Sequence, residues 1–533
     1  MAAASTIRRR WRPLASPTLL AVAGLTLLGF GIRLAEFDQS LLGDELSTYW
    51  IVHGHSLGDV LSSVRSNDEI TPPLYFVLGW ASLKLGPDPE WVRLPSLLAG
   101  TATIPLVYLL GARTVSRSTG VVAAAVIALS PFMIYYSVEA RSYALMIALL
   151  TASTVALLAA LDSGRGRWWF AYAACSCGAL LSHYTSVFPL AAQFAWVVWA
   201  HREAIRELLL SNLGVLIGFS PWIPGFIADN NSPTTAILSA LQPFTLDAVR
   251  FALEQWAVGY PYVRLESVPG VAAGVLLIAG LLIGAVGGAP RARQSLRGSS
   301  RGLSGALGRI PPRLILIALL AVATPLGEAV YSALGTNLLG ARNLNASSPG
   351  LAVAIGAIVT SAALPLAIAA VALVLSGFGL AAAKSLDSEV GRIDYAGAAR
   401  LIEARWGSGD VIVDAATLTP VPLTGLDVYL PPGHREFRLG LPRSDHPFMI
   451  GDPVPPPNRQ IAAALDAARG KSIFLVTHVD LSETTRQVAD LQRRKRNLGE
   501  RMLRRARPGF EVTYRKTLPG VAPLAVIELA DRG

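Results

Sequence analysis

Cysteine is almost missing from this chain of 533 residues, which has only Cys175 and Cys177. Residues two apart on a helix do not face each other, so the pair indicates packing, and a disulfide framework is excluded. Charged residues are also scarce, at 15%, against about 25% in soluble domains. The sequence has no P-loop, no GxGxxG and no zinc-ligand spacing, which excludes those nucleotide-binding and metal-binding signatures.

Long apolar segments take the place of charge before residue 385. They recur at lengths of roughly 16–22 residues, close to the ~20 that cross a bilayer core as a helix. Lipid satisfies no backbone hydrogen bonds, and the segments are too long and too continuous for barrel strands. They predict a polytopic all-α membrane domain over residues 1–384. The first segment follows an arginine-rich start without a convincing cleavage site, so we expect an uncleaved helix.

Positive charge predicts the orientation of these helices. The net charge is +10, but the arginines lie mainly between apolar segments, so no nucleic acid partner is expected. With the N-terminus in the cytoplasm, the inner loops hold 16 lysines and arginines and the outer loops seven. This distribution predicts a multi-pass protein of the cell inner or plasma membrane. Residues 36–93 and 229–268 are then external loops.

Two segments decide the number of crossings. Residues 73–86 are short and begin with two prolines, which favours an interfacial or re-entrant helix. Residues 346–383 carry no charge and would span roughly 57 Å as one helix, about twice the bilayer core. Pro365 divides them into two crossings of ordinary length. About eleven transmembrane helices and an extracytoplasmic C-terminal tail follow.

The tail, residues 385–533, has a different pattern. Amphipathic helices are expected at DYAGAARLIEARW and in the charged run TTRQVADLQRRKRNLGERMLRRA, with strands at GDVIVDA, KSIFLVTH, FEVTYRK and APLAVIELA. These elements predict a small soluble α/β domain.

Ionisable and polar groups gather at the external ends of the predicted helices. They are Asp44, Glu45, Asp68, Glu69, Arg93, Glu139, Arg141, His183, Tyr184 and Arg342. Ionisable groups at membrane depth are costly and tend to mark function. For Asp68, Glu69 or Arg93 taken singly, a structural ion pair or interfacial anchor is the favoured alternative. For Asp44 taken with Glu139, a shared functional site is favoured.

An acid and an arginine in an outward-facing membrane cleft fit glycosyl transfer from a lipid-phosphate sugar. Nucleotide sugars are not available outside the cell membrane, so the donor has to be membrane-borne. A carboxylate accepts the proton of an acceptor hydroxyl as that hydroxyl attacks the anomeric carbon. Arginine neutralises the departing phosphate by charge-assisted hydrogen bonds. Attack opposite the leaving group predicts inversion.

Five segments in order resemble bacterial protein-mannosyltransferase-like members of glycosyltransferase family 39 and their relatives, the lipid A aminoarabinose transferases. The segments are GDELSTYW, TPPLYFVLGW, WVRLPSLLAG, SPFMIYYSVEARSYAL and LSHYTSVF, and the resemblance is clearest over residues 36–200. It weakens to GARNLNASSPGL further on. The resemblance implies the GT-C fold.

The resemblance also implies roles for single residues. By position Asp44 is the catalytic base, with Glu45 its neighbour, and Glu139 is a second catalytic acid. Arg141 and Arg342 are candidates for contacts with the donor phosphate. The predicted substrate-binding residues are Arg93, Tyr143, His183 and Tyr184.

The sequence thus predicts an integral membrane glycosyltransferase for hexosyl or pentosyl transfer. It would move mannose or a related monosaccharide from a polyprenyl-phosphate donor to an envelope glycan, lipid or protein. The sequence indicates no cofactor with certainty, and the adjacent acids leave a divalent metal open. One alternative is a lipid-linked sugar transporter or flippase, which would place polar groups near the bilayer midplane. Another is an envelope polysaccharide polymerase or ligase, but the 229–268 loop holds only Arg250 and Arg264.

Overall fold

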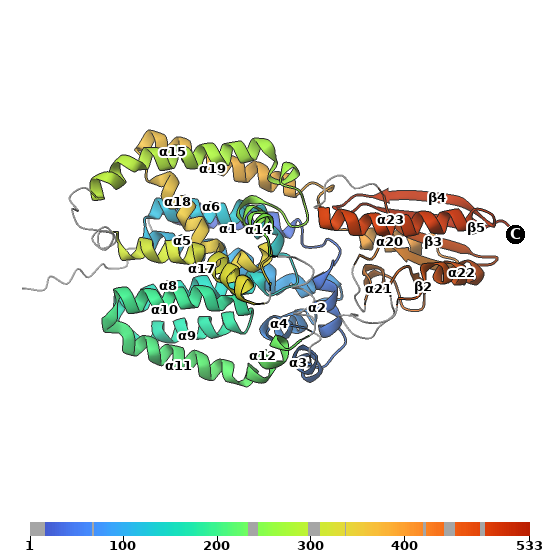
Figure 1. Ribbon diagram of the computed structural model, residues 1–533, viewed down its shortest axis with the longest axis horizontal. Helices are drawn as coiled ribbons and strands as arrows, with labels where there is room; N and C mark the ends of the chain where they lie inside the picture. Colours follow the sequence, from blue (N-terminus) through green and yellow to red (C-terminus); the bar gives the residue numbers. More distant parts are fainter. Residues whose placement is uncertain are drawn as a thin grey trace, which may run out of the picture.

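The computed structural model describes residues 16–533 apart from 67–68, 233–243, 297–309, 336, 419–422, 442–453 and 480–485. The molecule is elongated (Figure 1). A bundle of long helices forms one end, a sheet with its covering helices forms the other, and the short helices α2, α3 and α4 lie between them on one side. Asp68, one of the acids noted in the sequence, lies outside the described residues.

The bundle consists of long apolar helices with short connections. Within the described ranges, seven helices are long and apolar enough to cross a membrane. The helices of the bundle are α1 (Ser16–Leu34), α5 (Leu94–Thr114), α6 (Arg117–Leu129), α7 (Pro131–Tyr136), α8 (Tyr143–Ser163), α9 (Gly166–Leu180), α10 (Val187–Ala200), α11 (Ile205–Phe219), α12 (Ile223–Asn230), α15 (Val271–Leu296), α17 (Pro312–Leu334), α18 (Ser348–Thr360) and α19 (Leu364–Ser385). The protein is a multi-pass membrane protein, while the count of eleven crossings stays a prediction.

Two prolines mark the points at which long apolar segments divide into separate helices. Pro365 lies in the first turn of α19, so residues 346–383 form two helices rather than one. Pro131 separates α6 from α7, and the carbonyl groups at the end of α6 lose their helical donors. The buried Arg33 of α1 compensates, because its guanidinium donates to the carbonyls of Ile127 (3.0 Å) and Ala128 (3.2 Å). This arginine therefore satisfies backbone groups that lipid cannot.

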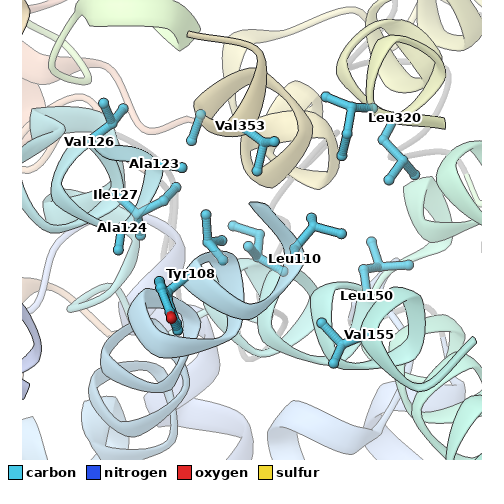
Figure 2. Packing of buried hydrophobic residues seen from close by; sticks show 14 of the residues in the cluster. Tyr108, Leu110, Ala123, Ala124, Val126, Ile127, Leu150, Val155, Leu320 and Val353 are labelled. Atoms are coloured by element: carbon cyan, nitrogen blue, oxygen red, sulfur yellow. The ribbon is translucent and has the colours of Figure 1, made fainter. Parts of the chain in front are cut away.

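The core of the bundle lies where α5, α6, α8, α17 and α18 meet. Figure 2 shows side chains from these helices, among them Leu110, Ile127, Leu150 and Val353, pointing toward one another. Gly120 lets the helices α5 and α6 approach closely, because a Cβ at this position would lie only 2.5 Å from the carbonyl oxygen of Tyr108. Small residues at such contacts are the usual basis of helix packing in membranes.

The segment predicted to be the first external loop folds into short helices. These are α2 (Asp44–Val52), α3 (Leu57–Arg65), α4 (Leu74–Ser82) and the 3₁₀-helix η1 (Pro89–Arg93). At nine residues, α4 is far too short to cross a bilayer core. A separate cluster of buried side chains holds these helices together, including Leu41, Tyr75 and Trp222.

The C-terminal part is a five-stranded sheet with helices on it. Its elements are α20 (Tyr395–Glu403), β1 (Val411–Ala415), α21 (Gly425–Tyr429), β2 (Arg435–Arg438), α22 (Pro457–Ala467), β3 (Ser472–His478), α23 (Arg486–Ala506), β4 (Phe510–Leu518) and β5 (Leu524–Asp531). The strand order is β2-β1-β3-β5-β4. The pairs β1–β2 and β1–β3 are parallel, and the pairs β3–β5 and β4–β5 are antiparallel. The predicted fold class, a polytopic helical protein with a small α/β domain at its C-terminus, is confirmed.

The sheet domain makes specific contacts with the loop that precedes α5. The hydroxyl of Tyr429 donates to Glu90 Oε1 (2.6 Å) and accepts from the backbone N–H of Leu41 (2.8 Å). The backbone N–H of Ala396 donates to Ser40 Oγ (2.9 Å). These contacts seat the tail on the loop that carries the predicted catalytic acids.

Candidate active site

Asp44 is the first residue of α2 and lies next to a glycine turn. Gly43 has a φ of 58°, a left-handed conformation that favours glycine. Asp44 Oδ2 accepts from Arg342 Nη1 at 2.6 Å, and the two side chains are 38% and 36% exposed. Burial alone would raise the pKa of Asp44, but the positive charges of Arg342 and Arg141 outweigh it and hold the pKa below its ordinary value. Asp44 is therefore ionised and accessible.

Glu45, the next residue, has entirely different surroundings. Its side chain is fully buried and its carboxylate accepts from Arg93 twice, at 2.7 Å each, and from Arg392. Two backbone N–H groups, those of Leu42 (3.1 Å) and Ala140 (2.8 Å), also donate to it. Burial alone would raise the pKa of Glu45, but Arg392 and Arg93 outweigh it and lower the pKa. These contacts favour a positioning role rather than the predicted catalytic one.

Arg93 and Arg392 complete the cluster around Glu45. The guanidinium of Arg93 also donates to the carbonyls of Phe37, Gln39 and Ser40, and no part of its side chain is exposed. Its predicted contact with substrate therefore has no surface available. Arg392, which was not among the predicted site residues, lies at the start of the tail. It donates to the carbonyl of Val138 (3.3 Å) and its guanidinium lies 4.4 Å from the ring centre of Tyr135.

Glu139 lies between α7 and α8 and is 4% exposed. Its Oε2 has no hydrogen-bond partner within the part of the chain that the structure describes. Burial raises the pKa of Glu139 to about 8, and the negative charges of Glu45 and Asp44 add to the effect, while Arg392 and Arg141 oppose it. The carboxyl group is therefore mostly protonated at neutral pH. Glu139 is thus close enough to Asp44 for the two carboxyl groups to interact electrostatically.

Arg141 is already paired. Its two terminal nitrogens both donate to the carboxylate of Glu69, and the Nη2–Oε1 distance is 3.0 Å. Both side chains are buried, at 8% and 1% exposure. The bidentate pair leaves Arg141 less available for a phosphate than Arg342. Among the described residues, only Asp44 hydrogen-bonds to the side chain of Arg342, so its other N–H groups are free.

The aromatic residues predicted to bind substrate lie in two different places. The rings of Tyr143 and His183 lie 5.2 Å apart, and both are buried close to the charges of Arg141 and Arg342. Burial lowers the pKa of His183 to about 3, and the two arginines add to the effect, so its imidazole is neutral. Tyr184 faces away toward α12, where its hydroxyl donates to Asp229 and accepts from the indole N–H of Trp222 (3.0 Å).

An open apolar groove of about 590 Å³ lies on the outer surface of α17. It is lined by Phe188, Ala323, Leu326, Gly327, Val330, Tyr331, Leu334 and Gly335. A Cβ on Gly327 would lie 2.1 Å from the Phe188 ring, so glycine lets this ring lie against the helix. Along the chain, its first lining residue, Phe188, follows His183 by a few residues, and its last, Gly335, precedes Arg342 by a few residues. Within the described residues, no group of three or more His, Cys, Asp or Glu is arranged to hold a metal.

Residues 71–224 match the profile of the family described as dolichyl-phosphate-mannose-protein mannosyltransferase. This segment contains Arg93, Glu139, Arg141 and His183 and begins after Asp44. The resemblance noted in the sequence is therefore confirmed over the matched residues. A search of curated proteins by sequence gave no match.

Two solved structures of ArnT from Cupriavidus metallidurans are similar to the whole chain. The apo structure has a TM-score of 0.54 and 13% sequence identity, and the alignment covers 96% of this chain and 97% of ArnT. The structure bound to undecaprenyl phosphate has a TM-score of 0.51 and 12% identity, covering 96% and 98%. At this identity the likeness concerns the fold, and it confirms the expected GT-C architecture.

Proposed function

We propose that this multi-pass protein of GT-C fold is a glycosyltransferase that uses a polyprenyl-phosphate sugar. It moves mannose or a related hexose or pentose to an envelope glycan, lipid or protein on the extracytoplasmic side. One observation carries the proposal: an accessible carboxylate, Asp44, is paired with an arginine, Arg342, whose other N–H groups have no partner among the described residues. The family match over residues 71–224 supports the same reaction class.

The pair divides the work of the reaction. The acceptor oxygen attacks the anomeric carbon while the bond from that carbon to the phosphate oxygen breaks, and the electron pair leaves with polyprenyl phosphate. Asp44 takes the acceptor proton as general base. Arg342 neutralises the charge that develops on the phosphate. Attack from the side opposite the phosphate inverts the anomeric configuration.

Donor binding also adjusts the base. Without donor, the charge of Arg342 is directed at Asp44 and lowers its pKa. A donor phosphate competes for the same guanidinium, so the carboxylate loses part of this stabilisation and becomes a stronger base. The base is thereby activated when a sugar is in place.

The charge balance of the site favours a phosphate. Asp44, Glu45 and Glu69 are paired with four arginines, Arg93, Arg141, Arg342 and Arg392. Glu139, with a pKa of about 8, adds little negative charge at neutral pH. The eight groups together therefore carry close to one net positive charge. Protonated Glu139 has an O–H to donate to an oxygen of the sugar or acceptor.

The groove on α17 suits the lipid part of the donor. Leu326, Val330 and Leu334 are 62%, 49% and 84% exposed, so the groove opens toward the surrounding bilayer. A prenyl chain laid in it would reach the site at the end of α17, where Arg342 follows. On the predicted topology this end, the site and the tail domain of residues 385–533 lie outside the cytoplasm.

The test uses a deletion of the gene in its host, complemented with variants. Wild-type protein should restore a sugar residue that one envelope glycoconjugate loses on deletion, measured by mass spectrometry. Asp44→Asn should not restore it, although the variant still binds polyprenyl phosphate. Asp88→Asn is the matched control, because Asp88 is an exposed acid of the same external segment without a side-chain cap bond. Full restoration by Asp44→Asn would refute the assignment of the base.

A further inference from the structure

A short segment after α14 (Leu246–Val258) carries an exposed tyrosine, Tyr262. Its neighbours Tyr260 and Val263 are fully buried, whereas Tyr262 is 39% exposed. The hydroxyl of Tyr260 donates to Glu36 Oε2 (3.2 Å), and the side-chain amide of Gln255 donates to the carbonyl of Val263 (3.0 Å). The segment is therefore fixed on both sides of the exposed tyrosine.

The backbone of Tyr262 is strained. Its φ is 67°, and within the described ranges it is the only residue other than glycine with a positive φ. This left-handed conformation is unfavourable for a bulky side chain, and glycine or asparagine would adopt it at lower cost. Such strain persists only where the surroundings impose it, and it is concentrated at functional sites. The strained conformation therefore indicates a functional role for the tyrosine side chain.

The ring of Tyr262 is the exposed end of a continuous row of aromatic side chains. Its ring centre lies 6.1 Å from that of Tyr135, which lies 5.2 Å from Tyr136. Tyr136 lies 5.0 Å from Tyr143, and Tyr143 lies 5.2 Å from His183. We call these five residues the aromatic row. The other four members are buried, so only Tyr262 presents much surface to a ligand.

The side chain of Tyr262 interacts electrostatically with Asp44, Glu139 and Arg342. Partial burial raises the pKa of Tyr262, and the nearby charges of Glu139 and Asp44 raise it further, while Arg342 opposes them. The same side chain therefore interacts with the base and with the phosphate-binding arginine. No hydrogen bond to this hydroxyl is present within the part of the chain that the structure describes.

We propose that Tyr262 contacts the sugar of the donor and determines which sugar is transferred. The inference rests on the proposed glycosyl transfer. During that reaction the sugar lies between the phosphate at Arg342 and the acceptor hydroxyl at Asp44, and the exposed Tyr262 is close enough to interact electrostatically with both residues. Its ring offers an apolar face to the ring carbons of the sugar, and its free hydroxyl can pair with a sugar hydroxyl. A hydroxyl partner discriminates between sugars that differ at that position, because the wrong sugar leaves the group unpaired.

The decisive variant is Tyr262→Gly, in the purified full-length protein in lipid nanodiscs. Glycine accepts the backbone conformation and removes the ring, so a structural role and a sugar-binding role predict opposite results. We expect a melting temperature equal to or above that of wild type, together with transfer slowed at least tenfold. Tyr262→Phe keeps the ring, so we expect faster transfer than with glycine and a weaker preference among sugars. The donors are polyprenyl-phosphate mannose, glucose and arabinose, with envelope material from the deletion strain as acceptor.

Tyr260→Phe is the matched control, because it removes a structural hydroxyl from the same segment. It should lower the melting temperature and leave the ratio of rates for the three sugars unchanged. Wild-type rates and ratios in Tyr262→Gly would overturn the inference, as would a fall in its melting temperature that accounts for the lost transfer. Failure of the proposed function is a separate outcome, since wild-type protein would then transfer none of the three sugars.

Discussion

Removing the charge of Glu45 is expected to lower the stability of the protein far more than removing the charge of its neighbour Asp44. Glu45→Gln keeps the size of the side chain but places an amide N–H₂ against two buried arginines. Breaking a buried, hydrogen-bonded ion pair costs about 3–5 kcal/mol, because the partner charges stay buried. Asp44→Asn removes a single, partly exposed ion pair, which is worth about 0.2–1 kcal/mol.

These free energies translate into different melting temperatures. For 533 residues, a loss of about 3–5 kcal/mol should lower the melting temperature of Glu45→Gln by roughly 3–5 °C, whereas Asp44→Asn should shift it by about 1 °C or less. Both variants should lose transfer, Asp44→Asn through the missing base and Glu45→Gln through a disturbed site. The assay is thermal unfolding of each detergent-solubilised variant, followed by intrinsic tryptophan fluorescence, beside a transfer assay at a temperature where both are folded.

A double-mutant cycle makes the comparison sharper. Arg392→Gln removes one of the two charges that Glu45 neutralises, so Glu45→Gln and Arg392→Gln together should destabilise the protein by less than the sum of the single effects. If Glu45→Gln were as stable as wild type yet inactive, Glu45 would be a chemical participant like Asp44 and the buried-cluster explanation would be wrong.

Four further outcomes are expected. In the folded protein Glu139 keeps its proton between its ordinary pKa of 4.5 and about 8, whereas the unfolded chain releases it, so stability falls as pH rises through this window. Glu139→Gln should remove this pH-dependent loss, which amounts to up to about 5 kcal/mol at pH 8. An equal gain in melting temperature at pH 5 and pH 8 would contradict this prediction. Arg342→Gln should weaken binding of polyprenyl phosphate roughly 10- to 100-fold, measured by isothermal titration, while Arg342→Lys should retain part of it. Val330→Trp, which fills the groove, should weaken binding of long-chain prenyl phosphates more than that of short-chain ones, and equal weakening would place the chain elsewhere. A reporter fused after Lys384 should read as extracytoplasmic, and a cytoplasmic signal would remove the last predicted hairpin.

Most of the fold could be predicted because hydropathy and proline position decide it. Apolar length predicted the membrane helices, and Pro365 predicted the division between α18 and α19. In the tail, strands β1, β3, β4 and β5 and helices α20 and α23 lie where the sequence pattern indicated. Strand β2 was missed, because its four residues, REFR, are at the edge of the sheet and lack a buried apolar run. Its position depends on pairing with β1, which no local pattern encodes.

The candidate site was predictable in its residue types but not in its pairings. Arg342 and Asp44 were both selected, although 298 positions separate them. Adjacent acids look equivalent in a sequence, so the enclosure of Glu45 by arginines and the exposure of Asp44 could not be predicted. Arg392 was missed because it lies in the tail, which composition separates from the membrane helices. Tyr262 was missed because a left-handed backbone leaves no trace in the residue type when the residue is not glycine.

The reach of Arg392 into the Glu45 cluster has a consequence for the order of synthesis. A ribosome completes α1 and the loop bearing Asp44 long before residue 392 is made, and α19 must be inserted before that arginine can arrive. A nascent or prematurely terminated chain ending before it therefore contains Glu45 and Arg93 but lacks the second arginine that holds the Glu45 carboxylate. The buried cluster that fixes the start of α2 is thus completed only when nearly three quarters of the polypeptide has been translated.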